Sequence, residues 1–492
     1  MTDRILLAEV LVAAPLAVAV IVACLPRRWT TALAVGGAAV TGALAVTVSG
    51  LALADAAHPR VGSWIALDAA GGLLVGVIGL VGLVSVLISP AYLATATSSL
   101  VADGRRATFY YVLVNVFWAA LLAVPLAGNL GTAWLLVEAT TAASALLVGF
   151  SGSARALEAG WKYLILTSLG LGIALLGIVL LAAGTPGGGL GALTWRTLPT
   201  YAGDPSTALV AYLLLLVGLA AKIGWAPVHN WLPDAHSQAP APVSALLSAA
   251  LLPAVLLVAW RCEQGLAPVI GQTTARNVLI GFGLASVAVA VPFLARQLAW
   301  KRLLAYSSLE HMGVIALGIG FGSPLALAGV AVHLTAHAVA KTLGFVVVTP
   351  LLAHRPSAAR EAVTGIGGSR PVLAAGMGVC LGTLSGLPPS PIFVSELLII
   401  AGGFQAGRPW IAGATALLLA LAFLGLSRSL LETTAWNTSA DAPEHERTAA
   451  LPGLRAAGAL AAVSTVVLVA LVGVSAWLPA TDLVDAFLKG VS

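Results

Sequence analysis

The sequence predicts an all-α, polytopic membrane protein with about 14 transmembrane helices. Apolar residues make up 59% of the 492 residues, charged residues only 9%, and the mean hydropathy is +1.00, whereas soluble domains carry about a quarter charged residues. The apolar residues fall into windows of roughly 20 residues, the length with which an α-helix crosses a ~30 Å hydrocarbon core. The basic residues are spread over the short segments between these windows, as in membrane proteins.

The windows follow one another along the whole chain. They lie at residues 5–25, 30–53, 71–93, 108–127, 130–150, 160–183, 207–229, 240–260, 275–295, 302–321, 325–352, 371–403, 409–430 and 455–478. We expect the first to remain as helix 1, because Arg27 and Arg28 follow its apolar run, whereas a signal peptide carries its charge before that run. We divide the chain into residues 1–103 with helices 1–3, 104–265 with helices 4–8, 266–435 with helices 9–13, and 436–492 with helix 14 and the tail.

The distribution of Lys and Arg predicts the orientation. Loops after odd-numbered helices hold 15 of the 24, namely Arg27, Arg28, Arg105, Arg106, Arg155, Lys162, Arg296, Lys301, Arg302, Arg355, Arg360, Arg370, Arg428, Arg447 and Arg455. The other side holds 7, namely Arg4, Arg60, Arg196, Arg261, Arg276, Arg408 and Lys489. We expect the protein to lie in the cell inner (plasma) membrane. Because cytoplasmic loops are rich in basic residues, we expect both of its termini outside the cytoplasm. The net charge of +5 then reflects orientation, and we expect no nucleic-acid partner.

We expect no redox centre, metal or nucleotide in this chain. Cys24, Cys262 and Cys380 stand far apart with no CxxC spacing, so neither an iron–sulfur cluster nor a zinc site has its ligands. The glycine-rich segment TPGGGLGAL, residues 185–193, does not connect a strand to a helix as a dinucleotide fingerprint does, and is expected to be a loop.

A few ionisable residues stand inside the apolar windows. A charge at bilayer depth costs about 2.5–3.5 kcal/mol even on the translocon-insertion scale, so such residues usually face a partner, a cavity or an ion path. They belong to helices 5, 7, 10, 11 and 12, an order that can pass a proton sideways through the protein. They are Glu138, Lys222, Glu310, His311, His333, His337, Lys341 and Glu396.

Each of these residues also has a purely structural interpretation. Glu138 and Lys222 would form a static ion pair between two helices, and Glu310 would pair with Lys301 and Arg302 at the cytoplasmic end of helix 10. The face shared by the helix 11 residues would be a polar packing seam. A metal pair of the HxxxH kind is disfavoured there, because HLTAH lacks the glutamate of HExxH and no third ligand is apparent.

Glycine and proline interrupt two windows next to an ionisable residue. Lys222 is followed by Pro227, Pro233, Pro240 and Pro242, and Glu396 is preceded by Gly386, Pro388, Pro389 and Pro391. Paired broken helices in corresponding positions of two repeats point to the ion site in transporters. The two interrupted helices, 7 and 12, are five apart, which is an odd number of crossings. The sequence therefore predicts two inverted five-helix repeats, helices 4–8 and 9–13.

Three polar residues follow the first break. His229, Asp234 and His236 lie in a long odd-numbered loop without Lys or Arg, where a proton from the cytoplasm would enter the protein. The alternative is that they cap the broken helix, with Asp234 bonding nearby N–H groups.

The segment KIGWAPVHNWLPDAHSQAPAPVSALL, residues 222–247, resembles the signature of the antiporter-like membrane subunits of respiratory complex I and its relatives. The resemblance continues in KRLLAYSSLEHMG (301–313), HLTAHAVAKTLGF (333–345) and GLPPSPIFVSELLI (386–399). The forms AYSSLEHMG and GLPPSPIFVSE look more like the branch of energy-converting hydrogenases, of the hydrogenase-4 and formate hydrogenlyase type.

The resemblance implies roles for individual residues. Glu138 and Lys222 match the family's pair at the first broken helix, His333 and His337 its bridging residues of helix 11, and Glu396 its ionisable residue at the second broken helix. In the family these sites translocate protons, driven by redox chemistry in partner subunits. The resemblance thus implies other membrane subunits and a peripheral redox arm as partners.

Lys341 also fits the hydrogenase branch, but the chain departs from the family pattern twice. Pro253, in ALLSAALLPAVLLVAW, stands where complex I subunits often have a helix 8 lysine that links two half-channels. Water held by carbonyls at a proline kink is the expected substitute. The tail ATDLVDAFLKGVS, residues 480–492, is too short for the long lateral helix of the largest complex I subunit.

Three functions remain open at this point. We favour a proton-pumping subunit of a membrane-bound hydrogenase or quinone oxidoreductase. The alternatives are a subunit of a multi-subunit sodium/proton antiporter, and a module that energises uptake of another solute or anchors a peripheral enzyme. Moving a proton against the membrane potential costs ~2.3 kcal/mol per 100 mV, and since the sequence shows no energy source, we expect the energy to come from a partner.

Overall fold

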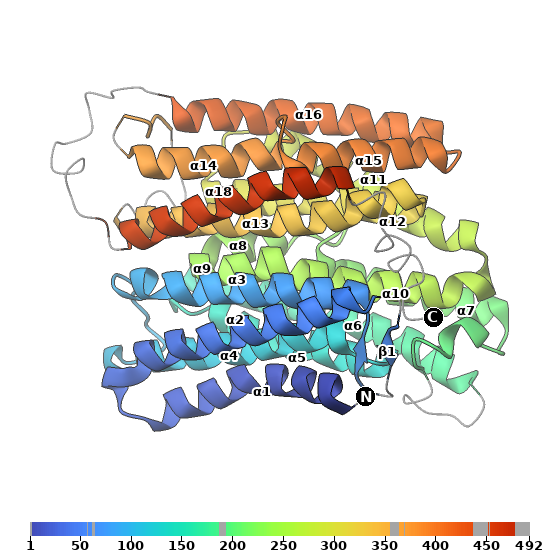
Figure 1. Ribbon diagram of the computed structural model, residues 1–492, viewed down its shortest axis with the longest axis horizontal. Helices are drawn as coiled ribbons and strands as arrows, with labels where there is room; N and C mark the ends of the chain where they lie inside the picture. Colours follow the sequence, from blue (N-terminus) through green and yellow to red (C-terminus); the bar gives the residue numbers. More distant parts are fainter. Residues whose placement is uncertain are drawn as a thin grey trace.

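The computed structural model describes residues 2–56, 58–61, 64–185, 193–354, 364–368, 370–435, 451 and 453–477. Within these residues, 13 helices are long and apolar enough to cross a membrane, and two shorter apolar helices, α14 (Pro371–Leu384) and α15 (Pro391–Gln405), follow each other. The two short helices together make up the predicted helix 12. The prediction of about fourteen crossings is therefore confirmed, and Figure 1 shows the helices running side by side along the long axis of the view.

The first four long helices form one side of the bundle. They are α1 (Thr2–Cys24), α2 (Thr30–Ala54), α3 (Ala69–Leu93) and α4 (Arg106–Ala123), with single turns of 3-10 helix η1 (Arg27–Trp29), η2 (Asp103–Arg105) and η3 (Val124–Leu126). Two antiparallel strands of two residues each, β1 (Arg60–Val61) and β2 (Ala66–Leu67), lie between α2 and α3.

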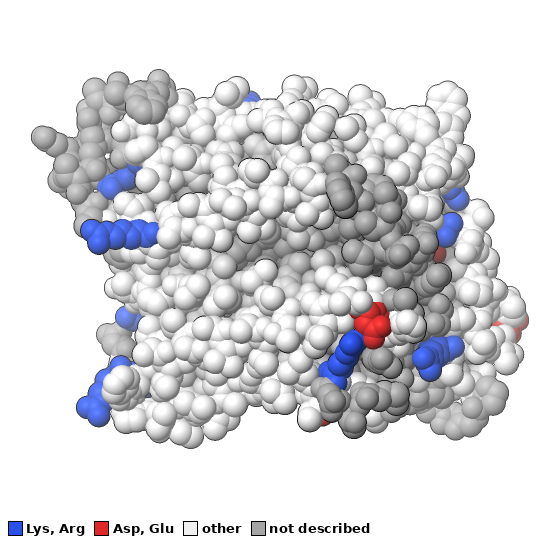
Figure 2. Space-filling model, in the orientation of Figure 1, with Lys and Arg blue, Asp and Glu red and all other residues white. Residues whose placement is uncertain are grey.

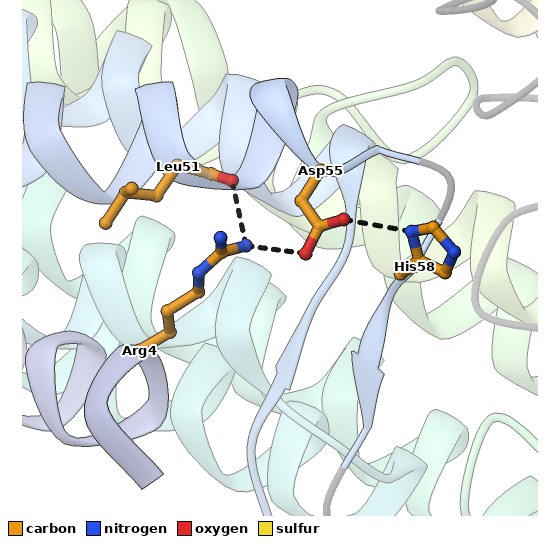
Figure 3. Close-up of polar contacts among 4 residues, drawn as sticks. All are labelled: Arg4, Leu51, Asp55 and His58. Atoms are coloured by element: carbon orange, nitrogen blue, oxygen red, sulfur yellow. Dashed lines mark hydrogen bonds and ion pairs between the residues drawn. The ribbon is translucent and has the colours of Figure 1, made fainter. Parts of the chain in front are cut away.

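A polar contact fastens α1 to the end of α2 (Figure 3). The Arg4 guanidinium donates to Asp55 Oδ2 at 2.7 Å and to the Leu51 carbonyl at 3.4 Å, and His58 Nδ1 lies 3.0 Å from Asp55 Oδ1. These residues belong to the end of the bundle where the chain begins, away from the charged residues inside the membrane helices.

The middle of the chain contains the first interruption. Its helices are α5 (Leu130–Val148), α6 (Ala154–Ala183), the turn η5 (Leu198–Thr200), α7 (Pro205–Ile223), the short α8 (Leu232–Gln238), α9 (Ala241–Leu246), the π-helical turn η6 (Leu247–Leu251) and α10 (Leu252–Ile270). The segments α9, η6 and α10 run on as one span, Ala241–Ile270. Hydroxyl and carboxylate caps fix several starts: Ser153, for example, accepts from the N–H of Ala156.

The second half of the bundle contains the second interruption. Besides α14 and α15 it has α11 (Gln272–Leu294), α12 (Trp300–Phe321), the long α13 (Pro324–His354), α16 (Pro409–Thr434) and α18 (Leu454–Trp477). The tail beyond residue 477, residues 186–192 of the glycine-rich segment and residues 436–450 lie outside the described residues.

Two of the most buried helices, α12 and α13, carry five of the ionisable residues. The apolar windows of α9–α10 and of α12 are completely buried and that of α13 is 89% buried, whereas the window of α18 is 17% buried. Figure 2 shows the outer surface accordingly, with charged side chains mainly toward the two ends of the helices and an almost uncharged band between them. A charge in the central helices is therefore shielded from both water and lipid.

Two basic residues assigned to loops lie inside the protein instead. Arg261 is 2% exposed and pairs with Asp68, whose carboxylate oxygen lies 3.0 Å from the guanidinium. Lys301 is 4% exposed. Arg261 directly follows the predicted window 240–260 and Lys301 directly precedes the window 302–321, and hydropathy alone does not show whether a side chain at a window edge turns inward. Removing one from each side leaves 14 against 6, so the predicted orientation does not depend on them.

Candidate functional site

The first break begins directly after Lys222. Helix α7 ends at Ile223, and Gly224 adopts a left-handed conformation with φ 79°, which glycine reaches without steric cost. The N–H groups of Gly224 and Trp225 both bond the Ala220 carbonyl, at 2.9 and 3.0 Å. The Ala221 carbonyl accepts from the Trp231 indole at 2.6 Å. A backbone carbonyl freed by the break is thus satisfied by a side chain of the same segment.

The second break, between α14 and α15, follows the same backbone plan. Gly386 is left-handed with φ 72°, and the N–H of Leu387 bonds the Gly382 carbonyl at 3.0 Å. Helix α15 then begins at Pro391, where the Ser390 hydroxyl caps the N–H of Phe393 at 3.2 Å. The predicted interruptions of helices 7 and 12 are therefore confirmed. The inverted repeat that they suggested stays a prediction.

The Lys222 ammonium group donates to two neutral hydroxyl oxygens. Its side chain is fully buried, and its Nζ donates to Thr141 Oγ1 at 2.7 Å and to the Tyr163 hydroxyl at 2.6 Å. The Tyr163 hydroxyl lies 2.8 Å from Ser144 Oγ, which links α5, α6 and α7. A lysine is thus held out of water without a counter-charge in contact.

Glu138 does not pair with Lys222. Its Oε1 accepts from the Ser168 hydroxyl at 2.7 Å, and its Oε2 has no hydrogen-bond partner among the described residues. No oxygen of the half-buried Glu138 lies within 4.0 Å of Lys222 Nζ, both residues being in the described part of the chain. The static ion pair considered from the sequence is therefore wrong. The two groups come from different helices, α5 and α7, and bond different partners.

The predicted mouth is charged, because α6 and α12 supply basic residues beside it. Asp234, near the start of α8, lies 3.5 Å from Lys162 Nζ and 3.4 Å from Arg302. No side-chain cap is formed at the start of α8, so the capping alternative for Asp234 is wrong. The carboxylate lines a surface pocket of about 430 Å³ together with Arg155 and Lys162.

The two histidines of this loop differ in depth. His229 is half-buried, and burial lowers its pKa. His236 is fully buried, stacks on Phe345 with ring centroids 5.9 Å apart, and neither ring nitrogen has a hydrogen-bond partner among the described residues. Asp234 thus lies at a surface pocket, and His236, two residues further along α8, is buried with both ring nitrogens free of hydrogen bonds to described residues.

Beyond this point, two histidines and a serine form a directed chain of hydrogen bonds. Ser395 Oγ donates to the Ile392 carbonyl at 2.7 Å, so it accepts from His333 Nδ1 at 2.8 Å. A neutral His333 then accepts at Nε2 from His311 Nδ1, which lies 3.0 Å away. A neutral His311 is left with a lone pair on Nε2, and that atom has no hydrogen-bond partner among the described residues.

His337 completes this group of histidines. Its ring centroid lies 5.3 Å from that of His311, it is fully buried, and both of its nitrogens are unpartnered within the described residues. The helix 11 histidines therefore are not a saturated packing seam. They present free nitrogens to one another and to α12.

Glu310 and Lys341 lie deep in the bundle. Glu310 is 2% exposed and makes no ion pair with Lys301 or Arg302, so that structural interpretation is wrong. Instead, Lys301 Nζ donates to the carbonyls of Ser237, at 2.9 Å, and Ala239, and Arg302 pairs with Asp234.

Lys341 is fully buried on α13. Its Nζ donates to the Leu304 carbonyl at 2.5 Å and to the Ser307 hydroxyl. Like Lys222, it is held by uncharged oxygens of a neighbouring helix. The two lysines are therefore equivalent in kind, one near the first break and one among the histidines.

Glu396 meets the α12 residues at the second break. One ligand atom each of Glu310, His311 and Glu396 lies within 4.8 Å of the others. A Cβ placed on Gly386 would come within 2.6 Å of Glu396 Oε2, so the glycine of the break lets the carboxylate lie against the backbone. Glu396 itself is half-buried.

Pro253 follows a π-helical turn rather than an open kink. The Leu252 N–H bonds the Leu247 carbonyl five residues earlier, which accommodates a proline inside a continuous span. Within that turn, Ser248 Oγ lies 2.8 Å from Ser308 Oγ of α12, and both serines are fully buried. The sequence reasoning missed this hydroxyl pair, because nothing in either segment predicts that the two serines meet. The predicted water at this crossing stays a prediction.

A second polar pocket was also missed. It lies beside the end of α10, has a volume of about 220 Å³, and is lined by Arg261, Glu263 and Arg276 among others. Glu263 Oε1 lies 3.6 Å from Arg276 Nε. From the sequence, Arg261 and Arg276 were counted only as loop charges and Glu263 was not considered.

Comparison with known proteins places this geometry in a family. The sequence pattern of the family "NADH:quinone oxidoreductase/Mrp antiporter, TM" matches residues 127–422, more than half of the chain. The chain belongs to this family. The matched segment contains both breaks and all the ionisable residues of the predicted proton path, so the family that the sequence resembled is confirmed.

Two curated relatives belong to different complexes. A hydrogenase-4 component F homolog of Methylacidiphilum infernorum is 31% identical over 380 residues, covering 76% of this chain and 79% of the relative. Subunit N of the NADH-quinone oxidoreductase of Desulforudis audaxviator is 27% identical over 355 residues, covering 72% and 69%.

Solved structures share the fold along the whole chain. A chain of the membrane-bound sulfane sulfur reductase, an archaeal respiratory membrane complex, superposes with a TM-score of 0.81 at 20% identity, and a chain of the Mrp complex from a Dietzia species gives the same values. Both comparisons cover 100% of each chain. At this identity they establish the fold alone.

Proposed function

We propose that this chain is a proton-translocating membrane subunit of a respiratory-type oxidoreductase complex, either an energy-converting hydrogenase or one similar to NADH-quinone oxidoreductase. Membership of the family and the likeness to a hydrogenase-4 component F homolog support this function. The observation that carries it is Lys222, which is fully buried next to a helix break and contacts only neutral oxygens. A buried lysine without a counter-charge gains and loses its proton readily as nearby charges change.

The proposed path runs between the two breaks. Protons enter beside Asp234 and His236 and load Lys222, with Glu138 as the neighbouring carboxylate that favours its charged form. They cross toward the histidines of α12 and α13 past the Ser248–Ser308 pair. The remaining members of the path are His229, Glu310, His311, His333, His337, Lys341 and Glu396.

The energy for this movement comes from partner subunits in the proposal. Other membrane subunits and a peripheral redox arm would supply it. Two of the solved structures with this fold are chains of multi-subunit respiratory complexes, which supports this part of the proposal. We place the complex in the plasma membrane with both termini of this chain outside the cytoplasm, on the count of basic residues in the loops.

A sodium/proton antiporter is the second candidate. The fold shared with the Mrp complex favours it. The likeness to the hydrogenase-4 homolog extends to 31% identity, which favours the redox-driven complex. The two functions differ in which ion crosses the membrane.

Inside-out vesicles that contain the whole complex test the proposal. Lys222→Ala is expected to abolish redox-driven acidification of the vesicle interior, reported by a pH-sensitive dye, while the complex still assembles on a native gel. Arg428→Ala, which removes an exposed charge paired with Glu432, is the control and should pump normally. Normal pumping by Lys222→Ala contradicts the proposal, and uptake of radioactive sodium that is driven by an imposed proton gradient and abolished by a protonophore favours the antiporter.

A further inference from the structure

Three ionisable side chains from two helices converge at the second break. Glu310 and His311 follow each other on α12 and Glu396 stands on α15, and one ligand atom of each lies within 4.8 Å of the other two. Two of the three residues are almost completely buried, Glu310 at 2% and His311 at 0% exposure. The group is therefore an internal cluster, unlike the solvated acidic patches that are common on protein surfaces.

Two atoms of this cluster lack a partner. Glu310 Oε2 and His311 Nε2 are buried and make no hydrogen bond within the described residues. Buried polar atoms are nearly always satisfied, because an unsatisfied one costs about 1–3 kcal/mol. Such a pair of atoms in one cluster indicates a place for a ligand.

The hydrogen-bond chain prepares His311 as a ligand. Because Ser395 donates to a carbonyl, the chain through His333 ends with a lone pair on Nε2 of a neutral His311. A metal-binding histidine usually has its other nitrogen held in this way, which fixes the tautomer and the ring orientation. The protein therefore already provides the outer support that a metal ligand needs.

The donor set selects the class of ion. One imidazole and two carboxylates suit a divalent first-row transition metal, whereas Mg²⁺ and Ca²⁺ prefer oxygen ligands alone. The two carboxylates also balance the charge of a divalent ion inside an apolar helix bundle. Bond lengths of 2.0–2.2 Å to a tetrahedral Zn²⁺ imply ligand atoms about 3.3–3.6 Å apart, so side-chain rotations of the two glutamates would close the present spacing.

We propose that Glu310, His311 and Glu396 form a binding site for a divalent transition-metal ion, with Zn²⁺ as its simplest probe, and that the bound ion blocks the second break. The site uses a glutamate pair and His311, whereas the HLTAH motif of helix 11 contributes only the supporting His333. An open fourth position would hold water, as in other three-ligand zinc sites. The blocking effect rests on the proposed function, because the ion would occupy three members of the proton path. The binding does not rest on it.

Direct binding is the first measurement. The purified complex, dialysed against micromolar Zn²⁺ and washed, is expected to retain one zinc ion more per chain than the Glu396→Gln and His311→Ala complexes. Glu432→Gln and His58→Ala remove a carboxylate and an imidazole from exposed or partly exposed positions and are the matched controls, which should bind as much as the unaltered protein. Equal zinc content in all five complexes overturns the site.

Zinc K-edge X-ray absorption on the unaltered complex does not depend on how a variant folds. We expect a first shell of nitrogen and oxygen only, at 2.0–2.2 Å. A sulfur neighbour at about 2.3 Å would place the ion on a cysteine of this chain or of a partner subunit and contradict the assignment.

The blocking effect is read separately in inside-out vesicles. Zn²⁺ at the concentration that fills the site is expected to lower the rate of redox-driven acidification at least tenfold. Bound zinc with unchanged pumping refutes the blocking effect and leaves the site standing. Zinc binding together with normal pumping by Lys222→Ala refutes the proposed function alone.

Discussion

The two helix breaks have the same backbone and different chemistry. In each, the residue after a left-handed glycine bonds the carbonyl four residues before that glycine, Trp225 to Ala220 and Leu387 to Gly382, both at 3.0 Å. In each, the residue four places after the glycine bonds the carbonyl of the residue directly after it, Val228 to Trp225 and Ser390 to Leu387, both at 2.9 Å. The two breaks thus share one turn geometry, while the inverted repeat stays a prediction.

The side chains differ in sign and in number. At the first break a single cation, Lys222, precedes the glycine and is held by hydroxyl groups. At the second, Glu396 follows the glycine and meets Glu310 and His311. The comparison teaches that the break supplies a place for an ionisable group, while the neighbouring helices decide which group and how many protons it shares.

The largest expected effect concerns Lys301, whose ammonium group bonds two backbone carbonyls after the first break. Lys301→Met would leave the carbonyls of Ser237 and Ala239 unsatisfied in a buried site, at about 1–3 kcal/mol for each orphaned group. We expect the yield of assembled complex on a native gel to fall severely. Arg302→Met, one residue along with a side chain that is 45% exposed, is the control and should assemble normally. Equal yields would show that α8 is held by packing alone.

The fold could be predicted further than the site. Apolar windows identified the helices, and glycine and proline identified both breaks, since these signals are local in the sequence. Lys301 and Arg261 were assigned to loops, because hydropathy alone does not show which way a charged side chain at the edge of an apolar window faces. The contacts of Lys222 with Thr141 and of Ser248 with Ser308 join helices far apart in the chain. No spacing rule predicts them.

Replacing each of the two glycines by alanine should distinguish the effect of backbone strain, which both breaks share, from the effect of the neighbouring side chain, which differs. Gly224→Ala and Gly386→Ala both force a left-handed alanine, which costs about 1–2 kcal/mol. The added carbon would lie 3.3 Å from a flexible Leu232 side chain in the first case and 2.6 Å from Glu396 Oε2 in the second. We expect Gly386→Ala to lower proton translocation per assembled complex several-fold more than Gly224→Ala. Equal losses would mean that the contact with the carboxylate has no role.

The hydroxyl pair between the breaks should have a moderate effect. Ser248→Ala removes one partner of the 2.8 Å contact with Ser308, in the π-helical turn that precedes Pro253. We expect pumping to fall a few-fold while assembly stays normal. Ser475→Ala, which removes a buried hydroxyl bonded only within its own helix, is the matched control. A Ser248 variant that pumps like the control would place the crossing elsewhere.

The smallest effect is expected at the mouth. Asp234→Asn removes a carboxylate held by Lys162 and Arg302 at the protein surface, where exposed ion pairs contribute about 0–1 kcal/mol. We expect assembly to be unchanged and pumping to fall by less than about threefold, most clearly at low salt, where the charges are least screened. Asp204→Asn, at an exposed helix cap, serves as the comparison. Complete loss of pumping in Asp234→Asn would make this residue an obligatory carrier.

The central claim is that the two breaks serve one proton path, and the single and double variants of Lys222 and Glu396 test it most directly. Redox-driven acidification is measured in inside-out vesicles with Lys222→Ala, Glu396→Gln and both changes together, normalised to assembled complex. A single path predicts that each variant alone abolishes pumping and that the double variant adds nothing. About half of the pumping left in each single variant, and none in the double, would contradict the claim and show two separate paths.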